Sequence, residues 1–321
     1  MILLTGAAGF IGSYLLGNLN GIGRYDIVIV DDFERSAKQP NLRNKIYEAK
    51  IQRQDLWQWL AGEHPKIEYV IHLGARTDTA EQDQTIFDEL NLSYTKRIWE
   101  YCTQEQIPLI YASSAATYGD GSLGFVDDHA LVPRYAPLNP YGWSKQTFDQ
   151  WALTQTETPP AWFGLKFFNV YGPNEYHKGR MASVVYHTYK QISETGKMKL
   201  FRSHREDFAD GEQKRDFIYV QDLAQVIRFL MKRQPDSGLY NLGTGQARTF
   251  NDLVKNVFSS LLLEPKIEYI DTPADIRDAY QYFTEADMSK FRATGYRSPF
   301  LSLEEGVQKY VQQFLSLRKY Y

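Results

Sequence analysis

The sequence predicts an α/β protein built on a doubly wound parallel sheet, and three observations lead to this fold class. Short apolar runs without alternation recur along the chain, as expected of strands that are covered on both faces. Helical segments separate these runs. Glycines and polar residues follow several of the runs directly, where a parallel sheet binds ligands at the carboxyl ends of its strands.

The first apolar run, Met1–Leu4, leads into a glycine-rich loop, and a helical pattern begins after it. Glycine permits a tight turn and a close backbone approach to a pyrophosphate, while a helix N-terminus offers free N–H groups to the anion. The loop between strand and helix therefore predicts a Rossmann-type dinucleotide site containing Gly6, Gly9 and Gly12.

The second run, residues 27–30, ends at Asp31 and Asp32. A carboxylate at this point, some twenty residues after the glycines, can accept hydrogen bonds from a ribose. Three cations could instead meet a 2′-phosphate: Arg35, Lys38 and Arg53. These residues alone leave NAD and NADP both open.

Further runs continue the alternation. The runs at 69–73 and 109–112 precede Gly74 and Ser113–Ser114, and those at 163–168, 217–220 and 239–242 come later. We expect the last two to return to the same sheet. This divides the chain into a dinucleotide-binding domain, residues 1–170 plus about 217–243, and a smaller interleaved α/β substrate-binding domain, about 171–216 plus 244–321.

Composition narrows the partners. The 321 residues carry a net charge of −3 and no long basic run, so we expect neither nucleic acid nor an anionic membrane as a partner. We find no signal peptide, and no apolar run is long enough to span a bilayer. We therefore expect a cytoplasmic homo-oligomer, and we expect no metal.

Tyr141 and Lys145 stand four residues apart at the start of a helical segment, after the irregular stretch 120–140. Positions i and i+4 share one helix face, so both side chains can reach one pocket. A free tyrosine, with a pKa of about 10, is a poor base at neutral pH. A nearby ammonium favours the phenolate, which predicts a proton shuttle.

Several motifs now occur in order: the glycine loop and the segments 113–119, 140–145, 168–173 and 215–220. With them the whole chain resembles the extended short-chain dehydrogenases/reductases that act on nucleotide sugars. The resemblance implies that Ser114 and Tyr141 bond the reacting sugar hydroxyl, and that Tyr141 moves its proton. It also implies that Lys145 holds the nicotinamide ribose and lowers the pKa of Tyr141.

Narrower features resemble the members of this family that invert C6 of an ADP-linked heptose for lipopolysaccharide core synthesis. They are the segments 172–179, 181–183, 279–284 and 286–287. This resemblance implies that a hydride leaves C6, gives a transient ketone and returns to the other face. It makes Lys178 a second base opposite Tyr141, with its pKa lowered by desolvation or by Lys145 and other cations.

The same resemblance assigns the remaining site residues. On the substrate side, where Arg215 would bind the diphosphate, they are Ser114, Asn169, Arg180, His187, Phe201, Arg215 and Tyr280. On the cofactor side they are Phe10, Ile11, Asp31, Asp32, Lys38, Arg53, Leu73, Gly74, Ala75, Asn91, Lys145 and Val170. The cations at positions 38 and 53 imply NADP, with NAD possible.

The chain departs from this pattern in places. Asp32 replaces an uncharged residue, and its negative charge beside a 2′-phosphate would weaken NADP relative to NAD. The segment 202–204 and the long charged loop up to Arg215 also differ, which affects the identity of the sugar or nucleotide more than the type of reaction.

Three other functions are alternatives for a chain of this kind. A 4,6-dehydratase would carry an Asp-Glu pair where Ala115 and Ala116 stand, which argues against dehydration. A UDP-hexose 4-epimerase rotates its intermediate and has no need of Lys178. A non-catalytic nucleotide sensor typically lacks the tyrosine and the lysine, and Tyr141→Phe would leave its function intact.

Overall fold

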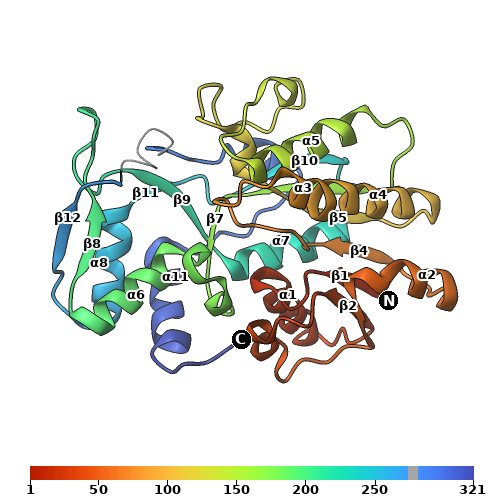
Figure 1. The fold of residues 1–321 in the computed structure, drawn as a ribbon, viewed down its shortest axis with the longest axis horizontal. Coiled ribbons are helices and arrows are strands. Elements are labelled where there is room, and N and C mark those ends of the chain that lie inside the picture. The colour runs from red at the N-terminus through yellow and green to blue at the C-terminus, as the bar shows by residue number, and fades with distance from the viewer. Residues whose placement is uncertain (274–280) are drawn as a thin grey trace.

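The computed structural model describes residues 1–273 and 281–321 (Figure 1). Its larger sheet has seven strands in the order β10-β6-β5-β4-β1-β2-β3, and all of them pair in parallel. The strands are β1 (Ile2–Thr5), β2 (Ile27–Asp31), β3 (Ala49–Gln52), β4 (Tyr69–His72), β5 (Leu109–Ser114), β6 (Trp162–Phe167) and β10 (Gly238–Leu242). The predicted doubly wound parallel sheet is confirmed.

Burial explains which strands the sequence revealed. Every residue of β1, β2, β4, β6 and β10 is buried, so these strands are mostly apolar, with single buried polar residues such as Lys166 in β6 and Asn241 in β10. The edge strand β3 is half-buried and includes Lys50 and Gln52, and the apolar pattern did not predict it. Strand order reverses between β1 and β4, where Thr5 pairs with His72, so the ligand crevice of the fold lies at this point.

Helices cover both faces of the large sheet (Figure 1). On one face α1 (Phe10–Asn20) packs against α7 (Val220–Arg233). The other face carries α2 (Leu56–Glu63), α3 (Gln84–Phe87), α4 (Tyr94–Gln104) and α5 (Pro140–Thr154). There Trp57 of α2 lies 5.6 Å from Tyr94 of α4, measured between ring centroids.

A smaller lobe is built around two further sheets, β11-β9-β7 and β12-β8. Its elements are β7 (Asn169–Tyr171), α6 (Val184–Thr195), β8 (Met198–Phe201), β9 (Lys214–Tyr219), β11 (Ala247–Thr249), α8 (Phe250–Ser260), β12 (Ile267–Ile270) and α11 (Leu303–Tyr310), and α10 (Ser289–Ala293) packs on β10 of the large sheet. This lobe has its own apolar core, which includes Val254, Phe258 and Val307.

The prediction that residues 217–220 return to the large sheet is wrong. They belong to β9 and the start of α7, and β9 pairs with β7 on one side and with β11 on the other. The run at 239–242 does return, as β10 beside β6. The chain therefore passes through much of the small lobe before it completes the large sheet.

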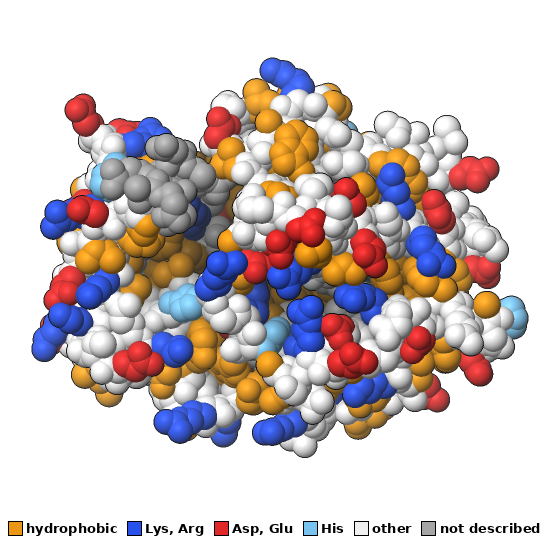
Figure 2. Space-filling model, viewed as in Figure 1, with side chains coloured by type: hydrophobic (Ala, Val, Ile, Leu, Met, Phe, Trp, Pro, Cys, Tyr) orange, Lys and Arg blue, Asp and Glu red, His pale blue; other side chains and the backbone are white. Residues whose placement is uncertain are grey.

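Figure 2 shows the same face of the molecule as a surface. Lysine, arginine and acidic side chains crowd the hollow between the two lobes. No helix within residues 1–273 and 281–321 is long and apolar enough to cross a membrane.

Candidate active site

A cavity of about 330 Å³ opens at the carboxyl ends of β1, β2 and β4. Four segments form its walls: the glycine loop, the end of β2, the loop after β4, and the short helical turn η6 (Tyr176–Met181). Its lining includes Gly6, Gly9, Phe10, Ile11, Gly12, Asp31, Asp32, Arg35, Lys38, Arg53, Leu73, Gly74, Ala75, Arg76, Thr77, Asp78, His177, Lys178 and Met181. Most of the predicted cofactor residues therefore meet in one cavity.

Two glycines of the loop have no room for a side chain. Gly6 has φ +69°, and a Cβ there would lie 2.6 Å from the amide nitrogen of Gly74. A Cβ on Gly12 would lie 2.1 Å from the carbonyl oxygen of Gly6. Gly9 begins α1 without a side-chain cap, so the first N–H groups of the helix remain free for an anion. These features fit the pyrophosphate of a dinucleotide.

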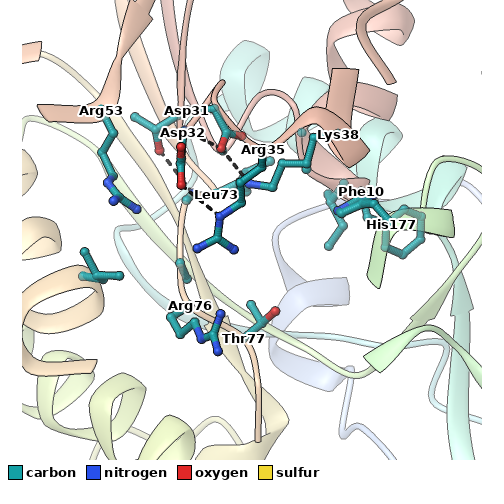
Figure 3. Close-up of a pocket in the computed structure, with 18 of the residues that line it drawn as sticks. Phe10, Asp31, Asp32, Arg35, Lys38, Arg53, Leu73, Arg76, Thr77 and His177 are labelled. Atoms are coloured by element: carbon teal, nitrogen blue, oxygen red, sulfur yellow. Dashed lines mark hydrogen bonds and ion pairs between the residues drawn. The ribbon is translucent and has the colours of Figure 1, made fainter. Parts of the chain in front are cut away.

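The acids after β2 are engaged by neighbours (Figure 3). Asp31 is buried and accepts hydrogen bonds from the backbone N–H of Ala8 at 2.9 Å and from Lys38 Nζ at 2.8 Å. Asp32 pairs with Arg35 at 2.9 Å. Arg53 also lines the cavity, on the side of Asp32 opposite Arg35. Two of the acids and two of the cations predicted from the sequence are therefore joined in ion pairs, Asp31 with Lys38 and Asp32 with Arg35.

Helix α5 positions the tyrosine and the lysine. Pro140 opens the helix, and the Asn139 side chain caps it by accepting from the N–H of Gly142 at 2.8 Å. Tyr141 is hydrogen-bonded to Ser114, the last residue of β5. Lys145 Nζ donates to the carbonyl oxygen of Ala112 at 2.8 Å. The predicted Ser114–Tyr141–Lys145 cluster is thus assembled at the end of β5.

Burial controls the electrostatics of this cluster. It lowers the pKa of Lys145 to about 8, and the charge of Asp149 opposes that shift. It also raises the pKa of Tyr141, against the hydrogen bond from Ser114. The expected lowering of the Tyr141 pKa by Lys145 is therefore not found, since desolvation of the phenol outweighs its neighbours.

Asn91 connects the loop after β4 to helix α5. Its side chain donates to Ser144 Oγ at 2.9 Å and to the carbonyl oxygen of Arg76, and it accepts from the N–H of Arg76 at 2.7 Å. The sequence analysis missed the neighbouring His72, which is fully buried between Thr5 Oγ1 at 2.6 Å and Thr95 Oγ1 at 3.0 Å. Its only sequence signal is a polar residue inside an apolar strand.

Lys178 lies in turn η6 and lines the cavity with its Nζ 5.6 Å from the Phe10 ring centroid. Burial lowers the pKa of Lys178, and the buried carboxylate of Glu175 opposes the shift. The cause is thus desolvation, and the predicted contribution of Lys145 and other cations is not found. Tyr141 does not line this cavity, so the opposition of Lys178 and Tyr141 stays a prediction.

Arg180 and His187 lie together at the rim. The Arg180 side chain is 66% exposed and pairs with Asp78 at 3.0 Å. His187 Nε2 lies 3.3 Å from the carbonyl oxygen of Arg180. His177, which was not among the residues predicted from the sequence, also lines the cavity, and its Nδ1 lies 3.2 Å from Asn41 Nδ2. The feature of the sequence that indicates it is its position next to Lys178.

The remaining predicted residues lie in the small lobe, apart from this cavity. Asn169 and Val170 are on β7, and the Asn169 side chain donates to the carbonyl oxygen of Asp216 at 3.2 Å. Arg215 on β9 is buried and donates to the carbonyl oxygens of Lys214 and Gln281. Phe201 ends β8, and Tyr280 lies outside the described residues.

Known proteins match the chain over nearly its whole length. A sequence model of the NAD dependent epimerase/dehydratase family matches residues 2–243. The chain is 46% identical over 326 residues to an ADP-L-glycero-D-manno-heptose-6-epimerase of Fusobacterium nucleatum, covering 98% of each chain. It is 48% identical over 318 residues to a protein of the same name from Nitratidesulfovibrio vulgaris, again with 98% of each covered.

Solved structures agree on the fold. The Helicobacter pylori ADP-L-glycero-D-manno-heptose-6-epimerase superposes with a TM-score of 0.78 at 29% identity, covering 97% of this chain and 95% of that one. A UDP-N-acetylglucosamine 4-epimerase of Methanobrevibacter ruminantium superposes with a TM-score of 0.83 at 24% identity, covering 98% of each, and shows the fold alone. The chain belongs to the NAD dependent epimerase/dehydratase family, as its resemblance to the extended short-chain dehydrogenases/reductases implied.

Proposed function

We propose that this protein converts ADP-D-glycero-D-manno-heptose to ADP-L-glycero-D-manno-heptose by redox-neutral epimerisation at C6, as a step that supplies lipopolysaccharide core synthesis. The observation that carries the proposal is the identity of 46–48% over 98% of the chain to proteins that bear the name of this activity. The Ser114–Tyr141–Lys145 cluster supplies the groups that proton transfer at a sugar hydroxyl requires.

A nicotinamide dinucleotide fits the residues present. Its pyrophosphate would be held by the free N–H groups at the start of α1 and by the close glycine turn. The ribose hydroxyls would meet Asp31 at one end and Lys145 at the other. When bound, the nicotinamide supplies a reversible hydride acceptor, so the sugar is neither oxidised nor reduced overall.

The residues of this chain carry the proton transfers. For one epimer, Tyr141, oriented by Ser114, accepts the proton of the C6 hydroxyl. Lys178, on the other side of the sugar, donates a proton to the keto oxygen when the opposite epimer forms, and the two residues exchange these roles in the reverse direction. Because burial lowers the pKa of Lys178, a larger fraction of its amine is neutral and able to accept a proton near neutral pH.

The substrate side rests on residues at the rim and in the small lobe. Arg215 binds the diphosphate, Asn169 and Phe201 contact the sugar nucleotide, and Arg180 and His187 lie at the cavity rim. Substrate-binding Arg215 must exchange part of its bonding to backbone carbonyls for phosphate oxygens.

We assign NADP as the preferred cofactor, with NAD also accepted. Lys38 and Arg53 line the cavity near Asp31 and could pair with a 2′-phosphate. Arg35 already pairs with Asp32, which reduces the repulsion that this acid would exert on the phosphate. A cytoplasmic homo-oligomer remains a prediction of the sequence.

Proton NMR of the purified protein incubated with ADP-D-glycero-D-manno-heptose tests the function. We expect the C6 epimer to form, and Tyr141→Phe and Lys178→Met each to lower the rate by about two orders of magnitude, or about 2.7 kcal/mol in the barrier. Interconversion of UDP-glucose and UDP-galactose, with the heptose left unchanged, would replace this proposal by the 4-epimerase function.

A further inference from the structure

Helix α5 and strand β5 are joined by a ladder of contacts. Four residues of helix rise about 6 Å and two residues of strand about 6.6 Å, so successive helix turns can each contact the strand. Tyr141 bonds Ser114, and one turn later Lys145 bonds the carbonyl of Ala112. The two active-site groups are the upper levels of this ladder.

The third level is Asp149, one further turn along the same helix face. Its Oδ2 accepts from Ser113 Oγ at 2.6 Å and from Lys166 Nζ at 2.7 Å, and its Oδ1 accepts from Tyr111 O–H at 3.1 Å. Lys166 on β6 also donates to Thr117 Oγ1 at 2.8 Å. The contacts tie helix α5 to β5, to β6 and to the turn η4 (Ala115–Tyr118).

Asp149 and Lys166 are both fully buried, with 0% side-chain exposure. Burial of an ion pair is costly unless geometry and additional hydrogen bonds offset the loss of hydration, and a well-packed apolar pair is often at least as stable. Stability alone therefore does not explain the pair. No step of the proposed reaction uses either residue directly.

We infer that Asp149 and Lys166 form a buried positioning pair that sets the placement and the charge balance of Tyr141 and Lys145. Asp149 lies one helical turn beyond Lys145 and two beyond Tyr141, and Lys166 faces it from β6. The inference rests on the proposed roles of Tyr141 and Lys145. The carboxylate of Asp149 holds protons on both, since it raises the pKa of Tyr141 and that of Lys145. Lys166 Nζ, 2.7 Å from the carboxylate, carries the opposite charge.

Other charged and titratable groups near the pair come from each element packed around it. Asp149 also acts on Tyr111, on Tyr118 and on His129, and Lys145 acts on His72. None of these groups is substituted in the variants below, so the comparison changes only the two charges of the pair.

The test measures the phenolate fraction of Tyr141 at pH 10 by NMR of protein labelled at tyrosine Cζ, with the resonance assigned by its loss in Tyr141→Phe. Asp149→Asn is expected to raise this fraction and Lys166→Gln to lower it, because each change removes one charge of opposite sign. The double variant Asp149→Asn/Lys166→Gln is expected to return toward wild type. The acid limb of the pH–rate profile should move to lower pH in Asp149→Asn and to higher pH in Lys166→Gln. In the double variant it should return toward its wild-type position.

Two controls separate charge from packing. Asp222 on α7 is also a buried carboxylate, which accepts from the N–H of Leu301 at 3.0 Å, and Asp222→Asn should leave the Tyr141 signal unchanged. Ser113→Ala removes a contact to Asp149 without changing charge, so it should lower the rate and leave the acid limb in place.

The outcomes are distinct. An unchanged phenolate fraction in Asp149→Asn overturns the inference even if the wild type epimerises the heptose. The expected shifts in a wild type that does not turn over support the pair and reject the proposed function. If Lys166→Gln does not fold, the Asp149→Asn and double variants decide the question.

Discussion

Asp78 and Arg180 form an ion pair across the rim of the cofactor cavity, with Oδ1 and Nη2 3.0 Å apart. Asp78 belongs to the loop after β4, and Arg180 to the turn that carries Lys178. Beside the pair, Thr79 Oγ1 lies 3.8 Å from Met181 Sδ. Both walls line the same cavity, so this contact fastens one to the other.

Loss of this pair should speed release of the dinucleotide. We expect Asp78→Asn to raise the dissociation rate about twofold to fivefold, the size of an exposed ion pair. Added salt should narrow the difference between wild type and variant. Stopped-flow cofactor release measures the effect. Asp207→Asn, which breaks the exposed pair with Arg205, is the control, and equal rates in all three proteins would show that the rim is not held in this way.

Glycine 12 should tolerate no side chain. In Gly12→Ala the new Cβ would meet the carbonyl oxygen of Gly6, so the loop must move away from the helix N-terminus. We expect cofactor binding to fall at least tenfold in calorimetric titration. Gly62→Ala, at an exposed position of helix α2 with no atom near the added Cβ, should leave binding unchanged and stabilise the fold by about 0.5–1 kcal/mol. Normal cofactor binding by Gly12→Ala would contradict the close packing.

Lys145 should make stability depend on pH. Its pKa falls to about 8 in the folded protein, below the value of a free lysine, so the unfolded chain binds its proton more tightly. The cost of the buried ammonium is fully present below about pH 8 and disappears as pH rises toward 10.5. Denaturant unfolding should therefore show wild type gaining stability relative to Lys145→Met between these values. The exposed Lys232→Met variant should show no such trend, and a flat difference for Lys145→Met would refute the assignment.

Cofactor choice should follow the charges after β2. Removing the acid in Asp32→Asn leaves Arg35 unpaired beside the cavity, so the affinity for NADP relative to NAD should rise about threefold to tenfold. Lys38→Met should shift the ratio the other way, because it removes the cation that now pairs with Asp31. Fluorescence titration with both cofactors measures the ratios. Identical ratios in both variants would place the 2′ recognition elsewhere.

Much of the fold was predictable from the sequence because the central strands are buried on both faces and therefore mostly apolar. Strand β3 was not predicted because it is an edge strand that includes Lys50 and Gln52 and therefore lacks the apolar pattern. The strands that pair with β9 could not be predicted from its own residues. Its partners β7 and β11 come from other parts of the chain, and the residue pattern within one strand does not specify which strands pair with it.

The site was predictable to the level of residue type. The glycine spacing predicted residues that line the cavity, and the Tyr141–Lys145 spacing predicted that both lie at the start of one helix, which is α5. Ion pairing between Asp31 and Lys38 and the third ladder level at Asp149 depend on rotamers and tertiary contacts, which sequence spacing does not encode. Burial raises the pKa of Tyr141, and the spacing of Tyr141 and Lys145 in the sequence does not reveal that burial.

The place of β10 beside β6 bears on how the chain folds during synthesis. Residues 238–242 emerge long after β6, and until then the six residues Trp162–Phe167 present an open, apolar hydrogen-bonding edge. The nascent chain must keep this edge from joining other chains while the small lobe is still being made. A fragment that ends near residue 170 should therefore aggregate under conditions in which the full chain stays dispersed. In the full chain, the two lobes should unfold in one transition.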